Sequence, residues 1–332
     1  MNKLSLLLMA LVVFSSACVS LSDMFQGSFG KTTVEETADI VVMQSKQTIP
    51  NPPVLAGNDF IVTFTLRNDD IKQDVSNVGL KLYNWGPCTA NKDKFEPDPD
   101  EWTPDVPSNP KTYTRTFAEL VPQQEESIEL AFTAPSNQQI GFLRTTCPIK
   151  WLVEYKFSAR SQDDFTIISA TKQKQLQRAG QPWEGTDEAP LAGIGPVKVL
   201  FRWLSQIPVQ SKGTLQFTLQ VVDRGSGLYK EVAKGSMFLK IPLDWGDEGN
   251  ACTDKFERID DENAFAVYRN AKAINLIKRE SAEISCKFRA PNLDDPLTAL
   301  NVPERSYLVV SNITDYNYQM FDEQAVDINP SQ

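Results

Sequence analysis

Cysteine is the residue whose chemistry matters most in this chain, because its 332 residues include five cysteines and no histidine. Without histidine, neither a Ser-His-Asp nor a Cys-His catalytic site can form, and imidazole metal ligation is excluded. No two cysteines have a CxxC spacing, which argues against a zinc site. Any chemistry must therefore come from cysteines, carboxylates, lysines or hydroxyl groups.

Acidic residues outnumber basic ones by 43 to 33, which gives a formal net charge of −10 and disfavours binding to nucleic-acid phosphates. Four acids in one proline-rich loop could hold Ca²⁺ through their oxygens: Asp98, Asp100, Glu101 and Asp105. A weaker group of the same kind lies near Trp245: Asp244, Asp247 and Glu248. Paired carboxylates could also serve a glycosidase. Since no calcium-loop motif is present and acidic loops are usually solvated, we expect no metal, no cofactor and no catalytic residue.

The first 18 residues have the pattern of an export signal. Lys3 precedes an apolar run of 11 residues, Leu4 to Phe14, and small residues then lead to Cys18. A bilayer span needs ~20 apolar residues, so this run is too short to cross a membrane. Residues 15–18 resemble the lipobox of lipoproteins, although Ser15 stands where leucine is usual. We expect removal of residues 1–17 and lipidation of Cys18, with a plain signal peptide as the alternative.

The remaining chain contains an internal duplication, which is the most specific pattern in the sequence. One motif, Trp85-Gly86-Pro87-Cys88-Thr89 with Asp93-Lys94-Phe95-Glu96, recurs as Trp245-Gly246 with Cys252-Thr253-Asp254-Lys255-Phe256-Glu257. Upstream, Leu80-Lys81-Leu82 matches Leu239-Lys240-Ile241, and downstream Trp151-Leu152-Val153 matches Tyr307-Leu308-Val309 after 156 residues. The predicted organisation is a spacer at 18–36, domain 1 at 37–168, a helix and linker at 169–195, domain 2 at 196–328 and a tail at 329–332.

Each repeat has the alternating pattern of antiparallel β-strands. Apolar residues recur at every second position in three clear stretches: Phe60/Val62/Phe64/Leu66, Leu215/Phe217/Leu219/Val221 and Ile149/Trp151/Val153/Tyr155/Phe157. Turns rich in proline, glycine and Asn or Asp separate these stretches, as in a two-sheet sandwich. The fold class is therefore predicted as all-β, with two tandem immunoglobulin-like antiparallel β-sandwich domains. Between them, Ser169 and Gly180 have the residue types of an N-cap and a C′ position of a short helix.

Export and duplication together suggest how the other four cysteines pair. Outside the cytoplasm thiols oxidise, so two disulfides are expected, and four cysteines allow three pairings. One bridge per domain gives Cys88–Cys147 and Cys252–Cys286. At the repeat offset, however, Cys147 and Cys286 fall on different strands, so either the two domains differ or the pairing is wrong. A Cys88–Cys252 bridge between the domains is the alternative.

Aromatic residues and one sequon are the remaining candidates for contact sites. Trp85 and Trp245 recur beside their cysteines, which favours core packing over a sugar platform. Trp102 and Trp183 do not recur and lie in polar, proline-rich surroundings, so we expect them to be exposed contact residues. Asn312 begins a clear N-x-S/T sequon and is a glycosylation candidate if the host uses it.

The combined pattern resembles that of archaeal cell-surface lipoproteins with CARDB-like, S-layer-associated immunoglobulin-like domains. It rests on the lipobox-like start and on strand patterns such as Gly195-Pro196-Val197-Lys198-Val199 and Gly213-Thr214-Leu215-Gln216-Phe217-Thr218-Leu219. The chain departs from the family where an Asn-x-Gly strand ending is usual, at Asn68-Asp69-Asp70 and Asp223-Arg224-Gly225. The resemblance implies extracellular adhesion, display or spacing, with no catalytic residues.

We therefore expect a non-enzymatic protein of the cell envelope, anchored to the membrane by an N-terminal lipid, that binds or spaces other envelope components. Its expected partners are that membrane and an unidentified envelope protein or glycan, and not nucleic acid. A ligand-binding lipoprotein, for glycans or for a transporter, is the first alternative. A hydrolase based on carboxylates, or on a Ser/Lys pair, is the second.

Overall fold

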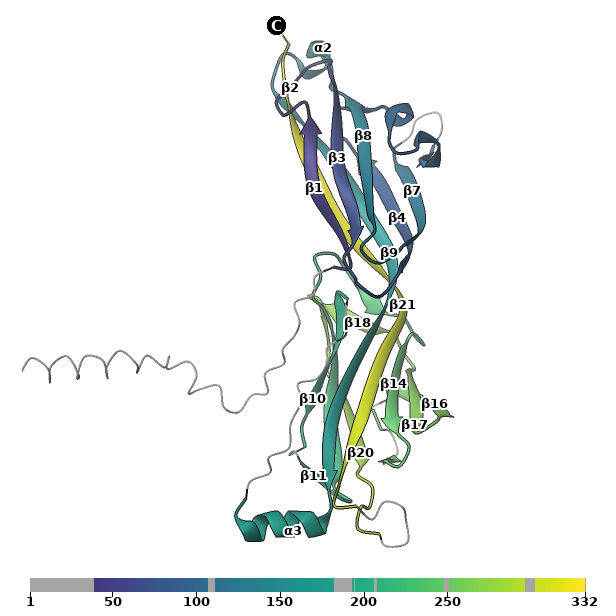
Figure 1. The fold of residues 1–332 in the computed structure, drawn as a ribbon. Coiled ribbons are helices and arrows are strands. Elements are labelled where there is room, and N and C mark those ends of the chain that lie inside the picture. Colours follow the sequence, from purple (N-terminus) through teal and green to yellow (C-terminus); the bar gives the residue numbers. More distant parts are fainter. Residues whose placement is uncertain are drawn as a thin grey trace, which may run out of the picture. The chain divides into compact units, whose positions relative to one another are not determined.

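The computed structural model describes residues 39–106, 111–181, 193, 195–205, 208–247, 251–252, 254–295 and 302–331 (Figure 1). The predicted signal peptide (1–17), the whole predicted spacer (18–36) with Cys18, and Trp183 lie outside these residues. Strands dominate the described part, and their pairing is overwhelmingly antiparallel, so the predicted all-β fold is confirmed. Among the described residues, no helix is long and apolar enough to span a membrane.

The strands form two β-sandwiches, which we call sandwich 1 and sandwich 2. One sheet of sandwich 1 has the order β1 (Val41–Ile49), β3 (Asp59–Asn68), β8 (Glu125–Thr133), β5 (Thr89–Ala90). One sheet of sandwich 2 is built on β12 (Thr214–Asp223), flanked by β10 (Val197–Trp203) and β20 (Ile284–Arg289). The same sheet also contains β13 (Glu231–Val232), β15 (Gly246–Asp247), β18 (Ile274–Ile277) and β19 (Glu280–Ser281).

A single ten-stranded sheet supplies the second layer of both sandwiches. In sandwich 1 it contributes β2 (Val54–Leu55), β4 (Val75–Asn84), β6 (Thr103–Pro104) and β7 (Tyr113–Leu120). In sandwich 2 it contributes β11 (Val209–Gln210), β14 (Met237–Pro242), β16 (Phe256–Glu262) and β17 (Phe265–Asn270). Its two central strands are β9 (Thr145–Ile168) and β21 (Glu304–Asn329), which run through both sandwiches (Figure 1).

The long strands β9 and β21 exchange their ends between the two repeats. They pair antiparallel from Ile168↔Glu304 to Thr145↔Ile328, with one irregularity between Ile313 and Tyr316. The first half of β9 pairs with β4 in sandwich 1, whereas its last residues pair with β11 in sandwich 2. Conversely, β21 starts beside β14 in sandwich 2 and ends beside β2 in sandwich 1. Each repeat therefore gives the second half of its last strand to the other sandwich.

This exchange corrects the predicted domain boundaries of 37–168 and 196–328. Sandwich 1 contains residues 320–329 from the second repeat, and sandwich 2 contains residues 159–168 from the first. Phe165 illustrates the point, since its ring lies 4.4 Å from that of Trp203 and 4.9 Å from that of Trp245, both in sandwich 2. Residues 34–332 form one compact unit. Each sandwich contains strand residues from both repeats.

The predicted alternation of buried and exposed residues is confirmed along the core strands. All four apolar residues predicted to face inward on β3 are buried, as are the corresponding four on β12 and five on β9. In the core of sandwich 1, Phe64 of β3 stacks on Trp151 of β9 with ring centroids 4.6 Å apart. Because each sheet buries one face, period-two patterning is what the packing requires.

Each repeat contains one disulfide. Cys88 is bonded to Cys147 on β9, with Cα atoms 5.9 Å apart, and Cys252 is bonded to Cys286 on β20, with Cα atoms 4.0 Å apart. These are the pairs that one bridge per repeat predicts. Cys147 lies on the ten-stranded sheet, whereas Cys286 lies on the opposite layer, so the repeats fasten the same loop to different strands.

Helix α3 (Ala170–Ala179) follows β9 as the capping residues predict. The Ser169 hydroxyl accepts a hydrogen bond from the backbone N–H of Lys172, and Gly180 ends the helix with a left-handed φ of 63°. The carboxylate of Asp294 accepts a further N–H from Ala170 at 3.0 Å. A shorter helix, α2 (Asn137–Ile140), lies between β8 and β9 and has a capping box formed by Ser136 and Gln139.

A buried polar cluster lies where the two sandwiches meet. The Tyr318 hydroxyl donates to the Asp223 carboxylate at 3.0 Å and accepts the backbone N–H of Gly227 at 2.9 Å. Asp39 accepts the N–H of Ser226 in the same loop at 2.9 Å. Burial, followed by the charges of Asp39 and Asp223, raises the pKa of Tyr318 well above its usual range. The hydroxyl therefore stays protonated and can donate to the carboxylate.

Candidate functional site

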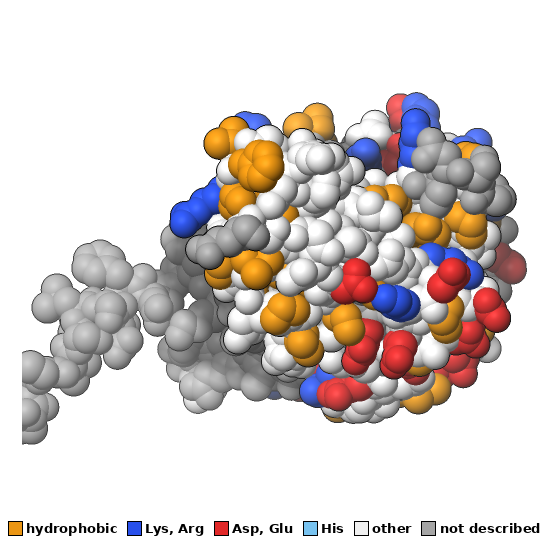
Figure 2. All heavy atoms as spheres, turned by 90° about the horizontal axis from the view of Figure 1, so that it is seen from above, with side chains coloured by type: hydrophobic (Ala, Val, Ile, Leu, Met, Phe, Trp, Pro, Cys, Tyr) orange, Lys and Arg blue, Asp and Glu red, His pale blue; other side chains and the backbone are white. Residues whose placement is uncertain are grey.

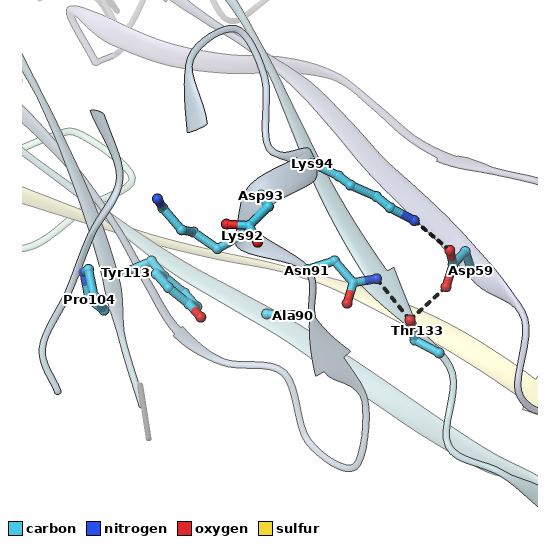
Figure 3. Close-up of a pocket in the computed structure, with 9 residues that line it drawn as sticks. All are labelled: Asp59, Ala90, Asn91, Lys92, Asp93, Lys94, Pro104, Tyr113 and Thr133. Atoms are coloured by element: carbon cyan, nitrogen blue, oxygen red, sulfur yellow. Dashed lines mark hydrogen bonds and ion pairs between the residues drawn. The ribbon is translucent and has the colours of Figure 1, made fainter. Parts of the chain in front are cut away.

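A polar groove in sandwich 1 lies on the loop that carries the repeated motif. The loop contains the 3₁₀ helix η2 (Lys92–Lys94), and the groove has a volume of about 530 Å³ (Figure 3). Its lining comes from this loop, from β6 and β7, and from the ends of β3 and β8: Asp59, Ala90, Asn91, Lys92, Asp93, Lys94, Pro104, Tyr113 and Thr133. A neighbouring hollow of about 520 Å³ shares Asp59, Asp93 and Lys94 and extends past Glu96 and Glu129.

Asp59 organises one end of this groove, which we call the sandwich 1 groove. Its carboxylate accepts the Thr133 hydroxyl at 2.6 Å and the Lys94 ammonium at 2.9 Å, and Asn91 donates to Thr133 at 2.8 Å (Figure 3). The hydrogen bond from Thr133, and then that from Lys94, lowers the pKa of Asp59. A carboxylate held in its ionised form can accept hydrogen bonds from a ligand but is a poor general acid at neutral pH.

Tyr113 forms the other side of the sandwich 1 groove. Its ring packs edge-on against Phe95 at 5.6 Å and stacks with Trp85 at 5.7 Å. Burial, followed by the charges of Asp93 and Asp105, raises the pKa of the Tyr113 hydroxyl, so this group remains a neutral donor and acceptor. The groove thus combines an aromatic wall with charged and amide groups, an arrangement that suits a polar, uncharged ligand or a peptide.

The acidic loop proposed as a weak calcium candidate does not bring its four carboxylates together. Asp98 accepts the N–H of Asp100 at the start of the 3₁₀ helix η3 (Pro99–Glu101), and Glu101 forms an ion pair with Arg115 at 2.7 Å. Asp105 accepts two backbone N–H groups, from Thr112 and then Lys111, which lower the pKa of Asp105. Within the part of the chain that the structure describes, no group of three or more potential metal ligands is present.

The predicted exposure of Trp102 is wrong. Trp102 is only 1% exposed and packs edge-on against Phe95 at 5.2 Å, so it belongs to the core rather than to a contact surface. Asn312 lies inside β21, between Phe238 of β14 and Arg160 of β9, and is half-buried. Glycosylation of Asn312 stays a prediction. Trp245 is buried, as expected for core packing, and Trp85 is half-buried.

A second hollow lies in sandwich 2 beside β21 and has a volume of about 340 Å³. The Tyr307 hydroxyl donates to Asp244 at 2.8 Å, and the Arg305 guanidinium donates to the same carboxylate at 3.3 Å. Burial, followed by the hydrogen bond to Asp244, raises the pKa of Tyr307 well above its usual range. The remaining lining is mainly apolar and includes Leu243 and Phe265.

An exposed apolar surface covers the end of sandwich 1 that carries α2. Four large hydrophobic residues there are 47–70% exposed: Ile49, Leu55, Phe142 and Leu143. Figure 2 looks onto this end, and hydrophobic side chains gather over one part of it while acidic side chains gather over another. Exposed apolar patches of this kind mark contact surfaces for other molecules.

Sequence reasoning did not find the sandwich 1 groove, although one signal pointed to it. Asp93 and Lys94 are repeated as Asp254 and Lys255, but this repetition indicates a duplicated domain and not a ligand site. Asp59 and Thr133 carry no motif, and only the pairing of β3 with β8 sets them opposite each other.

Comparison with known proteins gives similarity to solved structures alone, since no family model and no curated protein matches the chain. The chain is similar to the major pilin subunit BcpA of Bacillus cereus, with 8% identity over 76% of this chain and 56% of that chain, and a TM-score of 0.27. It is also similar to the yeast delta-COP-I mu-homology domain, with 9% identity over 88% and 93% of the two chains and a TM-score of 0.22. For the B domain of a biofilm-associated protein the values are 9% identity, 84% and 73% coverage, and a TM-score of 0.23.

Proposed function

We propose that this protein is a non-catalytic component of the cell envelope, held at the membrane by a lipid on Cys18, that presents two fused β-sandwiches for contact with other envelope molecules. The observation that carries this proposal is the pair of disulfides, Cys88–Cys147 and Cys252–Cys286, in a chain that begins with an export-like segment. Disulfides persist in oxidising compartments, so both features support the same location.

The chemistry of the described polar groups supports an interaction role rather than catalysis. In the sandwich 1 groove Asp59 forms an ion pair with Lys94, and the pKa of Asp59 is lowered rather than raised. A general acid at neutral pH needs the opposite shift. The exposed apolar end of sandwich 1 supports contact with another macromolecule.

The anchor is tested by the mature N-terminus of the full chain expressed in a host that processes lipoproteins. We expect mass spectrometry to find a diacylated N-terminal cysteine, and membrane fractionation to recover the protein with the membranes. The Cys18→Ser variant should lose the lipid and leave the membrane fraction. A mature chain that starts at another residue, or that starts at an unmodified Cys18, would reject the anchor.

The sandwich 1 groove supports a second function, the binding of a polar ligand such as a glycan. Its volume of about 530 Å³ and its aromatic wall at Tyr113 suit such a ligand. A glycan array probed with the purified chain tests this function, with Asp59→Ala as the binding-deficient variant. Binding that is equal for both proteins would rule out this groove.

A further inference from the structure

In sandwich 2, part of one edge of β21 has no partner strand among the described residues. Along one side β21 pairs with β9 over its whole length. Along the other side β14 pairs only with Val310–Ile313, through Lys240↔Val310 to Met237↔Ile313. Over the described residues, no strand pairs with Ser306–Val309 on that side. Within the described part of the chain, the backbone groups on this edge therefore have no strand partner, and an unpaired edge of this kind can accept a further strand.

The first repeat fills the corresponding position. Trp151 of β9, which aligns with Tyr307, pairs with Leu82 of β4, and the pairing continues to Lys150↔Asn84. In sandwich 1 the edge therefore carries a strand along the four residues that align with Ser306–Val309. In the first repeat, the equivalent edge of β9 therefore binds an extended polypeptide backbone, that of β4.

The sequence explains why the second repeat leaves the edge open. Leu80 pairs with Val153, whereas its counterpart Leu239 pairs with Ser311, so β14 is displaced by two residues along its neighbour. Pro242, which has no N–H, then ends β14. The N–H of the following Leu243 bonds to Ala264 in the turn after β16, which takes the chain away from β21.

The hollow of about 340 Å³ in sandwich 2 lies beside this open edge. It is lined by residues from both sides of the gap: Pro242, Leu243, Asp244, Ala264, Phe265, Arg305, Ser306, Tyr307 and Leu308. Asp244, Arg305 and Tyr307 bind one another, which leaves the apolar surface of Leu243 and Phe265 as the part available for a ligand. Leu243 is 44% exposed.

We propose that this gap is a docking slot for an extended peptide segment of a partner protein. The segment adds as a strand along Ser306–Val309 and places an apolar side chain against Leu243 and Phe265. Backbone hydrogen bonds give such a complex its affinity, and the hollow selects the side chain. This docking slot is the surface through which the interaction role proposed above would act, so the inference rests on that role. The binding test of the slot does not depend on the lipid on Cys18.

The first repeat supplies a probe for this slot. A fluorescein-labelled peptide with the sequence of residues 78–84, Val-Gly-Leu-Lys-Leu-Tyr-Asn, reproduces the segment that covers the equivalent edge in sandwich 1. Fluorescence anisotropy with the purified chain should show saturable binding. Leu243→Asp places a charge in the hollow and should weaken binding by about tenfold or more, equivalent to ~1.4 kcal/mol. Leu204→Asp is the matched control, because Leu204 is similarly exposed at 48% but lies outside the hollow, and it should leave the affinity unchanged.

Backbone methylation distinguishes strand addition from nonspecific apolar binding. The N–H groups of successive residues in a strand point to opposite edges. A peptide N-methylated at every second residue on the edge that faces β21 should therefore lose binding, whereas a peptide N-methylated at the other residues should retain it. Hydrogen exchange of Ser306–Val309 should be fast on the open edge of the free protein and slower with the peptide bound. No saturable binding, equal binding of both methylated peptides, or equal affinity of the Leu243→Asp and Leu204→Asp variants would overturn the proposal. Failure here would leave the result for the N-terminal lipid unchanged.

Discussion

The exchange of β9 and β21 predicts that a substitution in one repeat destabilises the sandwich formed mainly by the other. Ile328 belongs to the second repeat but is fully buried in sandwich 1, where it pairs with Thr145 and Val54. Ile328→Ala removes three carbon atoms, which costs about 2.4 kcal/mol of transfer free energy at ~0.8 kcal/mol each. A residual cavity raises the expected loss in the free energy of unfolding to about 3–4 kcal/mol.

Hydrogen exchange with mass spectrometry locates this loss. Since ~1.4 kcal/mol corresponds to a factor of ten, the amides of β3 and β8 should exchange about 100-fold faster or more in the Ile328→Ala variant. Ile167→Ala is the matched variant, because Ile167 belongs to the first repeat but is fully buried beside Val209 in sandwich 2. It should accelerate exchange in β12.

A strand exchange is contradicted if each substitution affects only the sandwich of its own repeat. In that case Ile328→Ala would accelerate exchange in β12 and leave β3 and β8 unchanged, as expected for two independent tandem domains. A loss of protection in both sandwiches agrees with the exchange, because the shared strands couple them.

Three further predictions concern the junction, the disulfides and acid stability. Tyr318→Phe removes a buried hydroxyl that binds a carboxylate and a backbone N–H, and it should cost about 1–3 kcal/mol in urea unfolding; an unchanged midpoint would contradict this role. Replacing Cys252 and Cys286 together by serine should cost about 2–5 kcal/mol under non-reducing conditions, and equal stability would show that the bridge does not constrain the chain. The hydrogen bond from Thr133 lowers the pKa of Asp59 in the folded protein below the ordinary value of 3.8. The ionised carboxylate therefore stabilises the fold above about pH 4, and this contribution is lost as the pH falls through the lowered pKa. The stability difference between wild type and Asp59→Asn should therefore shrink towards pH 2, and a difference independent of pH would contradict the shift.

Local patterning predicted the strands well because burial of one sheet face imposes a period of two. The inward residues of β3, β9 and β12 could be named from the sequence, and so could the caps of α3 at Ser169 and Gly180. The disulfide pairs followed from one bridge per repeat. These features depend on short stretches of sequence or on the duplication itself.

The exchange of strands could not be predicted, because the same alternation suits a strand whichever sheet it joins. Residues 145–168 alternate without a break in their buried positions, so no turn signal marks the point where β9 passes from one sandwich to the other. The burial of Trp102 could not be predicted for a related reason. Its neighbours in sequence are polar, whereas the loop brings its packing partner Phe95 against it. The sandwich 1 groove depends on Asp59 and Thr133, which only strand pairing brings together.

Zero-length cross-linking of the native monomer shows whether the end of the second repeat lies inside sandwich 1. Two ion pairs join the first repeat to the end of β21, Lys46–Asp322 at 2.8 Å and Lys150–Glu323 at 3.1 Å. Carbodiimide treatment followed by mass spectrometry should recover both pairs as amide cross-links within a monomer. Absence of both links from the monomer, or their recovery only from dimers, would contradict the exchange.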